Sequence, residues 1–196
     1  MIAVFLADGF EETEALVTVD FLRRAGLDVQ TVAVAVLNSI ESNVIRGAHN
    51  IRVLCDWAPN IDDEISWEPL EAVILPGGMP GAANLEVSGL VQTALEYAHQ
   101  NGLLIAAICA APSILAHLDL LEGKRAVCFP GYEDDLRNGG ASVMDEYVVE
   151  DGQFITAKGA GCTIDFAEAI AARFAGKDKA QEIREVMQTP YSLHVL

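Results

Sequence analysis

The chain has 196 residues, of which 52% are hydrophobic, and its 12 basic and 29 acidic residues give a formal net charge of −17 at pH 7. This length and apolar content are typical of a globular protein with a substantial core and exclude an intrinsically disordered chain. The charge argues against nucleic acid and anionic membranes as partners, because both need a patch of basic residues.

Strands and helices alternate along the sequence. We predict strands over 2–7, 29–36, 72–75, 103–108 and 125–129, a hairpin of two short strands over 44–46 and 51–54, and two further short strands over 147–149 and 154–156. The predicted helices cover 11–25, 90–100, the segment that ends at His117, 132–137, 163–174 and 178–187. Near-continuous apolar strands separated by helices indicate a mostly parallel sheet with helices on both faces. We therefore expect residues 1–196 to form a single doubly wound α/β domain.

The cysteines and the hydropathy indicate where the protein resides. The four cysteines, Cys55, Cys109, Cys128 and Cys162, are widely spaced and form no C-x-x-C pair. This spacing argues against a disulfide framework and against a zinc site. No segment has the roughly 18 consecutive apolar residues needed to span a bilayer. We expect a cytoplasmic protein without a metal or membrane anchor.

The segment 102–115, G-L-L-I-A-A-I-C-A-A-P-S-I-L, is the most informative part of the sequence. An apolar run of strand length leads directly into the first turn of a helix, with Cys109 at the corner. A strand-to-helix corner flanked by small residues, here Ala107 and Ala111, is the arrangement of a nucleophile elbow. Because the helix dipole favours a thiolate there, we expect a lowered pKa for Cys109. The alternative is a buried packing cysteine.

Two other segments follow strands of the same predicted sheet, at the edge where doubly wound proteins bind ligands. One ends at Glu14, after the strand over 2–7, and the other contains Gly77 and Gly78. Gly77 and Gly78 come directly after the strand over 72–75, without the lysine of a P-loop or the G-x-G-x-x-G spacing. Their backbone N–H groups could form an oxyanion hole, and the alternative is a tight turn.

Glu14 stands out among the acidic residues at the start of the first helix. At 100° per residue it shares a stripe with Val17, Thr18 and Phe21, and we therefore expect it to be partly buried. Burial raises the pKa of a carboxyl group toward neutrality, which suits Glu14 to accept or share a proton. Glu11 and Glu12 are explained adequately by their interaction with the helix dipole.

The remaining candidate residues favour structural interpretations. None of the histidines, His49, His99, His117 and His194, is an obvious partner for Cys109, and no Cys-His hydrolase pair is visible in the sequence. Cys162 follows G-A-G at a predicted helix start and therefore could also have a lowered pKa. We favour a packing or capping role for it, and a packing role for Cys55 and Cys128.

Together these motifs resemble the DJ-1/ThiJ/PfpI superfamily, and most closely its DJ-1/ThiJ branch. The matching segments are A-D-G-F-E-E-T-E at 7–14, V-D at 19–20 with R-R-A-G at 23–26, L-P-G-G at 75–78, and A-A-I-C-A at 106–110. Weaker matches at 138–140 and 159–161 extend the resemblance over nearly the whole chain.

The resemblance implies a flavodoxin-like domain, similar to class I glutamine amidotransferases, that forms a homodimer and needs no cofactor. It implies that Cys109 is the reactive cysteine, that Glu14 is a protonated carboxyl touching it, and that Gly77, Gly78 and Ala110 supply backbone donors. In the PfpI branch a histidine occupies the position of Ala110, so a peptidase is not expected.

Three further departures bear on activity. Phe129 stands where a DJ-1 histidine is implicated in glyoxalase turnover, Ala111 replaces a glycine, and Lys158 replaces an arginine. We expect a cysteine-dependent glyoxalase or deglycase that acts on methylglyoxal-like dicarbonyls or their adducts. The alternatives are a non-catalytic redox sensor, in which Cys109 oxidises to a sulfinate, and a chaperone-like structural dimer.

Overall fold

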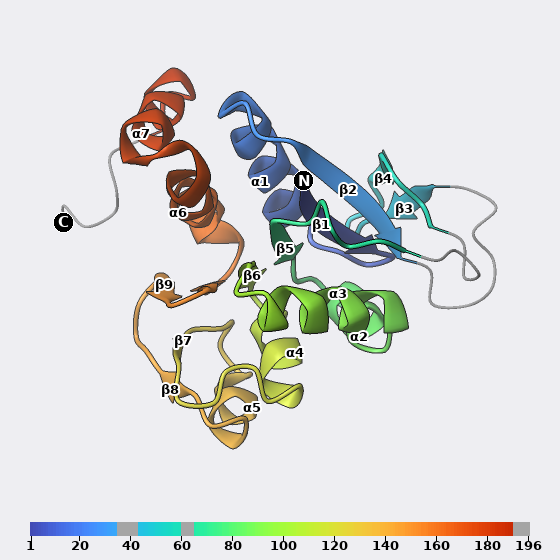
Figure 1. Ribbon diagram of the computed structural model, residues 1–196, viewed down its shortest axis with the longest axis vertical. Coiled ribbons are helices and arrows are strands. Elements are labelled where there is room, and N and C mark those ends of the chain that lie inside the picture. Colours follow the sequence, from blue (N-terminus) through green and yellow to red (C-terminus); the bar gives the residue numbers. More distant parts are fainter. Residues whose placement is uncertain (35–42, 60–64, 190–196) are drawn as a thin grey trace.

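The structure is a computed structural model that describes residues 1–34, 43–59 and 65–189 (Figure 1). The strands are β1 (Ile2–Ala7), β2 (Val29–Val34), β3 (Val44–Arg46), β4 (Arg52–Leu54), β5 (Ala72–Leu75), β6 (Leu104–Ile108), β7 (Arg125–Ala126), β8 (Ser142–Val143), β9 (Val148–Asp151) and β10 (Phe154–Ala157). The helices are α1 (Glu12–Arg24), α2 (Gly81–Glu86), α3 (Gly89–Gln100), α4 (Pro112–His117), α5 (Glu133–Asn138), the 3₁₀ turn η1 (Ala160–Cys162), α6 (Thr163–Ala175) and α7 (Lys177–Val186).

The main sheet has the strand order β2-β1-β5-β6-β10-β9. Its first five strands are parallel, and β9 pairs antiparallel with β10 at one edge. The chain runs outward from β1 to β2 and then returns to place β5 on the other side of β1. The switch point, where a doubly wound sheet binds ligands, therefore lies between the carboxyl ends of β1 and β5.

Both faces of the sheet are buried, as the apolar strands predict. In β1 the side chains of Ile2, Val4 and Leu6 enter one core cluster, and those of Ala3, Phe5 and Ala7 enter the other. Helices α1, α6 and α7 lie on one side of the sheet, and α2 to α5 lie on the opposite side (Figure 1). The expected mostly parallel α/β sheet with helices on both faces is confirmed.

Most predicted elements form, and the differences have local causes. The predicted hairpin is present as β3 and β4, which pair antiparallel in a separate two-stranded sheet. The strand predicted over 29–36 is described as far as Val34, and its last two residues lie outside the described residues. Helix α2 was not predicted, because it is short and begins at a glycine.

The strand predicted over 125–129 is mostly wrong. Only Arg125–Ala126 is a strand, and it pairs with β8 outside the main sheet. The N–H of Val127 donates to Oγ1 of Thr156 at 3.0 Å, and the N–H of Phe129 donates to the carbonyl of Cys109 at 2.8 Å. These bonds engage the backbone groups that a longer strand would have paired. Among the described residues, no helix combines the length and the apolar character needed to cross a bilayer.

Candidate active site

Cys109 occupies the corner between β6 and α4 in strained backbone geometry. Its φ is +66°, in the left-handed region that L-residues seldom adopt. Its N–H donates to the carbonyl of Ala157 in β10 at 2.9 Å, and its own carbonyl accepts the N–H of Phe129. The thiol is free and half-buried. The strand-turn-helix corner predicted from the sequence is therefore present.

Glu14, in the first turn of α1, is buried as its place on the apolar stripe predicts, with only 1% of its surface exposed. Its Oε2 accepts the backbone N–H of Gly77 at 2.7 Å. Its Oε1 is buried and has no hydrogen-bond partner of ordinary geometry among the described residues. Burial is the main reason that the pKa of Glu14 is raised to about 7, and the bond from Gly77 acts in the opposite direction.

Gly77 lies where three elements meet. A Cβ at this position would be 2.6 Å from Cβ of Cys109 and 2.9 Å from Oε2 of Glu14. The absence of a side chain therefore lets the loop after β5 contact both the helix carboxyl and the elbow. The Gly77 N–H is already bonded to Glu14, so it orients the carboxyl. It therefore does not act as the oxyanion donor that the sequence predicted.

The thiol of Cys109 is electrostatically coupled to Glu14. Burial, followed by the charge of Glu14 and a side-chain interaction with it, raises the pKa of Cys109 to about 12. The backbone N–H groups of Gly78 and Ala110 interact with the sulfur and act in the opposite direction. The expected lowering of this pKa by the helix dipole is therefore wrong, because burial and a neighbouring carboxylate outweigh it. At neutral pH the thiol therefore keeps its proton and the carboxyl is about half protonated, and the two titrations are coupled.

The other cysteines are structural, as their sequence contexts suggested. Cys162 is buried, and its Sγ lies 3.0 Å from the carbonyl of Gly159, to which it donates. Burial raises its pKa rather than lowering it. Burial also raises the pKa of Cys55 to about 11 and of Cys128 to about 12.

The described histidines have partners other than Cys109, or none near it. Nδ1 of His49 lies 2.8 Å from Oε2 of Glu12, and Nδ1 of His117 lies 2.5 Å from Oε1 of Glu86. The ring of His99 packs against Phe154. His194 lies outside the described residues. A Cys-His pair is therefore absent from the part of the chain that the structure describes.

Two residues that depart from the family pattern lie near the elbow. Phe129 lies next to the elbow because its backbone N–H donates to the carbonyl of Cys109. Its side chain is 47% exposed, and a Cβ on Gly159 would lie 3.2 Å from Cδ2 of its ring. Lys158 forms an ion pair with Asp145 at 3.2 Å and lies over the ring of Tyr147. An exposed aromatic side chain thus occupies the neighbourhood of the site.

Glu12 has a role that its sequence position did not reveal. It is 6% exposed, its Oε1 accepts the N–H of His49 at 2.7 Å, and a Cβ on Gly47 would lie 2.3 Å from the same oxygen. Burial raises its pKa, but hydrogen bonds led by that of His49 outweigh burial and hold the pKa below its ordinary value. Among the described residues, Glu11, Glu12 and His49 are the group whose donor atoms lie close enough to hold a metal ion, within 4.8 Å of one another.

Comparisons with known proteins agree with this geometry. Residues 1–173 match the model of the DJ-1/PfpI family. Protein dj-1beta of Drosophila melanogaster is 36% identical over 189 residues, which cover 96% of this chain and 97% of the relative. A protein of Pyrococcus abyssi named as a deglycase is 30% identical over 160 residues, which cover 80% of this chain and 89% of that protein.

Solved structures give the same result. A variant of a DJ-1 superfamily protein from Salmonella typhimurium matches with a TM-score of 0.86 at 35% identity, over 97% of this chain and 98% of the other. The sequence match and the structural match both extend over the sheet, the elbow and helix α1. The chain therefore belongs to the DJ-1/PfpI family.

Proposed function

We propose that this protein is a cytoplasmic, cysteine-dependent and cofactor-free glyoxalase or deglycase that acts on methylglyoxal-like dicarbonyls or their adducts. The observation that carries the proposal is the contact between a half-buried thiol and a buried carboxyl whose pKa is raised to about 7. A carboxyl with a pKa near neutrality is suited to accept and return protons at physiological pH. The relative named as a deglycase supports the same class of substrate.

In the first step, the Glu14 carboxylate takes the thiol proton of Cys109. The sulfur electron pair forms a C–S bond with the aldehyde carbon of methylglyoxal, and the C=O electrons move to oxygen as an alkoxide. The N–H groups of Gly78 and Ala110, which interact with the sulfur, are the donors for this oxyanion. Glu14 then returns its proton to the alkoxide and completes a hemithioacetal.

In the second step, Glu14 removes the hydrogen from the carbon that bears sulfur, and the electrons form an enediolate with the adjacent carbonyl. Glu14 returns this proton to the adjacent carbon, and the hydroxyl proton of the former hemithioacetal moves to the neighbouring oxygen, which leaves a 2-hydroxy thioester on Cys109. Water hydrolyses the C–S bond, releases lactate and regenerates the thiol. The sum is one methylglyoxal and one water converted to one lactic acid, without an external oxidant.

The test measures methylglyoxal loss and lactate formation by the full chain, Cys109→Ala and Glu14→Gln. The matched control is Cys128→Ala, which removes a buried thiol from a neighbouring segment. We expect lactate from the wild type and the control, and loss of turnover in the first two variants. Equal rates in Cys109→Ala and wild type, or no wild-type rate above buffer, would exclude the proposed reaction.

A second function, redox sensing, is favoured by one observation. Oε1 of Glu14 is buried without a hydrogen-bond partner among the described residues, and its proton is held up to a pH of about 7, the pKa of Glu14. A protonated Oε1 is a donor for the oxygen of an oxidised Cys109, formed when the thiol and two peroxide molecules give a sulfinic acid and two waters. Intact mass after mild peroxide should rise by about 32 Da in wild type and stay unchanged in Cys109→Ala.

A further inference from the structure

The hairpin formed by β3 and β4 places two arginines side by side. In its antiparallel register, Arg46 lies directly opposite Arg52, and both are exposed. Val44 shares their face of the hairpin, whereas Ile45 points the other way and is buried in the core. Like charges directly opposite each other on one face destabilise a strand pair.

These two arginines differ from the others in the chain. Each of the other six arginines forms an ion pair with an aspartate or glutamate: Arg23, Arg24, Arg125, Arg137, Arg173 and Arg184. Within the ranges that the structure describes, the side chains of Arg46 and Arg52 have no such partner. In a chain of net charge −17, two adjacent unpaired guanidinium groups form a local positive site.

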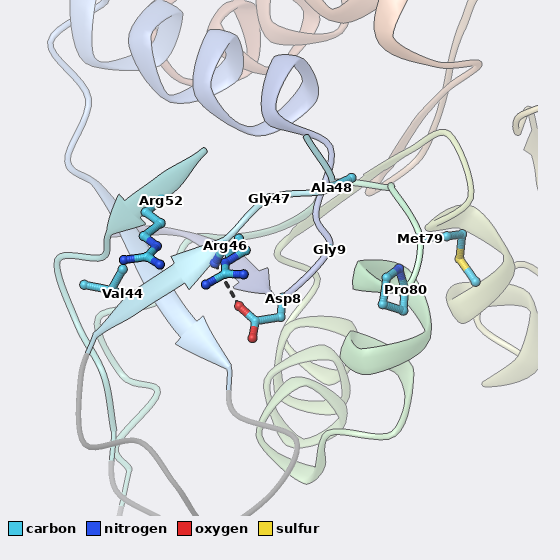
Figure 2. A pocket seen from close by; sticks show the side chains of 9 residues that line it. All are labelled: Asp8, Gly9, Val44, Arg46, Gly47, Ala48, Arg52, Met79 and Pro80. Carbon is cyan, nitrogen blue, oxygen red and sulfur yellow. Dashed lines mark hydrogen bonds between the residues drawn. The ribbon is translucent and has the colours of Figure 1, made fainter. Parts of the chain in front are cut away.

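Both arginines line a pocket of about 670 Å³ beside the carboxyl ends of β1 and β5 (Figure 2). Val44 lies beside the arginines on one side of the pocket, Met79 and Pro80 lie on the other side, and Asp8 lies between them (Figure 2). Oδ1 of Asp8 accepts the backbone N–H of Arg46 at 2.8 Å. Neither Cys109 nor Glu14 lines this pocket. It is thus a second concave site, and the loop that follows β5 contributes Met79 and Pro80 to it.

We propose that this pocket binds a phosphomonoester of a small organic molecule. Two guanidinium groups present planar sets of donors that match the oxygens of a dianionic phosphate, and the charge balance with Asp8 still favours a doubly negative group over a single carboxylate. Met79 and Pro80, on the side of the pocket away from the arginines, contact the organic part of the ligand. The inference does not depend on the reaction proposed for Cys109.

Asp8 provides a further test of the proposal, because its negative charge acts against the binding of an anion. Its carboxylate repels a phosphate, but the same oxygen holds the backbone of Arg46. Asp8→Asn removes the charge and keeps an oxygen that accepts this N–H. We therefore expect Asp8→Asn to bind phosphate more tightly than wild type, whereas Arg46→Gln and Arg52→Gln each bind at least about tenfold more weakly, which corresponds to about 1.4 kcal/mol.

The experiment is titration calorimetry of the full chain with glycerol 3-phosphate, inorganic phosphate and succinate at constant ionic strength. Arg24→Gln is the matched control, since it removes an exposed arginine that is already paired with Asp20. We expect saturable binding of both phosphates, tighter than succinate, that is unchanged in Arg24→Gln and in Cys109→Ala. Similar affinity for inorganic phosphate and glycerol 3-phosphate would overturn the role of Met79 and Pro80 and with it the phosphomonoester.

Three other results overturn the proposal. The first is the absence of saturable heat with either phosphate, and the second is succinate binding as tight as that of glycerol 3-phosphate. The third is an oligomer that dissociates in Arg46→Gln and Arg52→Gln by sedimentation velocity, which identifies the arginines as part of an interface with a second copy. Thermal unfolding of each variant shows whether a loss of binding reflects a loss of fold.

Discussion

Glu14→Gln should make the protein more stable than wild type at neutral to basic pH. The wild-type carboxyl is buried, and its pKa rises from an ordinary value of 4.5 to about 7. Between these two pH values the unfolded chain has released the proton while the folded chain still holds it. Stability therefore falls as the pH increases across this window, and a glutamine, which does not ionise, escapes the loss.

The size of the effect follows from the same values. A rise from 4.5 to about 7, at about 1.4 kcal/mol per pH unit, corresponds to about 3 kcal/mol of stability lost between pH 4.5 and pH 8. The Gly77 N–H keeps an oxygen acceptor in the glutamine variant, so its hydrogen bond is retained. The expected change is thus in the pH dependence rather than in the packing.

Urea unfolding at about pH 5 and about pH 8, under reducing conditions, measures the difference. Wild type should lose about 2.5 kcal/mol relative to Glu14→Gln between the two pH values, whereas Glu68→Gln, a change at an exposed turn residue, should track wild type. Histidine titrations are common to all three proteins and cancel. Parallel pH profiles for wild type and Glu14→Gln would refute the reasoning that burial raises this pKa.

Two further predictions concern packing and charge. Gly77→Ala should destabilise the protein by about 2 kcal/mol in urea unfolding, because its Cβ would lie 2.6 Å from that of Cys109. Gly89→Ala, whose Cβ would have nothing within 4 Å, should not destabilise it. Equal effects of the two substitutions would contradict the close approach at Gly77. His117→Gln should reduce stability at pH 6 and have little effect at pH 9, because its bond with Glu86 raises the pKa of His117 and this stabilisation is lost as the pH rises through the raised value. A loss that is independent of pH would assign His117 a packing role alone.

The sequence predicted those parts of the site that depend on local patterns. The corner at Cys109 follows from an apolar strand that runs into Pro112 without a loop, and the burial of Glu14 follows from helical periodicity. The meeting of both with Gly77 follows from the rule that strand ends converge in a parallel sheet. These three features needed no knowledge of distant contacts.

The parts that could not be predicted depend on contacts between distant segments. The pKa of Cys109 is raised rather than lowered, because the thiol is buried beside Glu14, and a helix dipole is the only one of these influences visible in local sequence. Glu12 is buried because the turn between β3 and β4 folds over the start of α1 and brings His49 to it. The segment after β7 leaves strand geometry because Thr156 and Cys109 engage its backbone.

The backbone bonds of Cys109 have a consequence for synthesis of the chain. The left-handed conformation of a residue other than glycine costs about 1 kcal/mol or more. The backbone hydrogen bonds that hold Cys109 in it are made with Ala157 in β10 and with Phe129, and both residues are synthesised after Cys109. A nascent chain that ends after α4 has neither anchor and leaves β6 without one of its neighbours. The thiol is therefore fixed in this geometry only when β10 joins the sheet. Most of the chain has been synthesised before that happens.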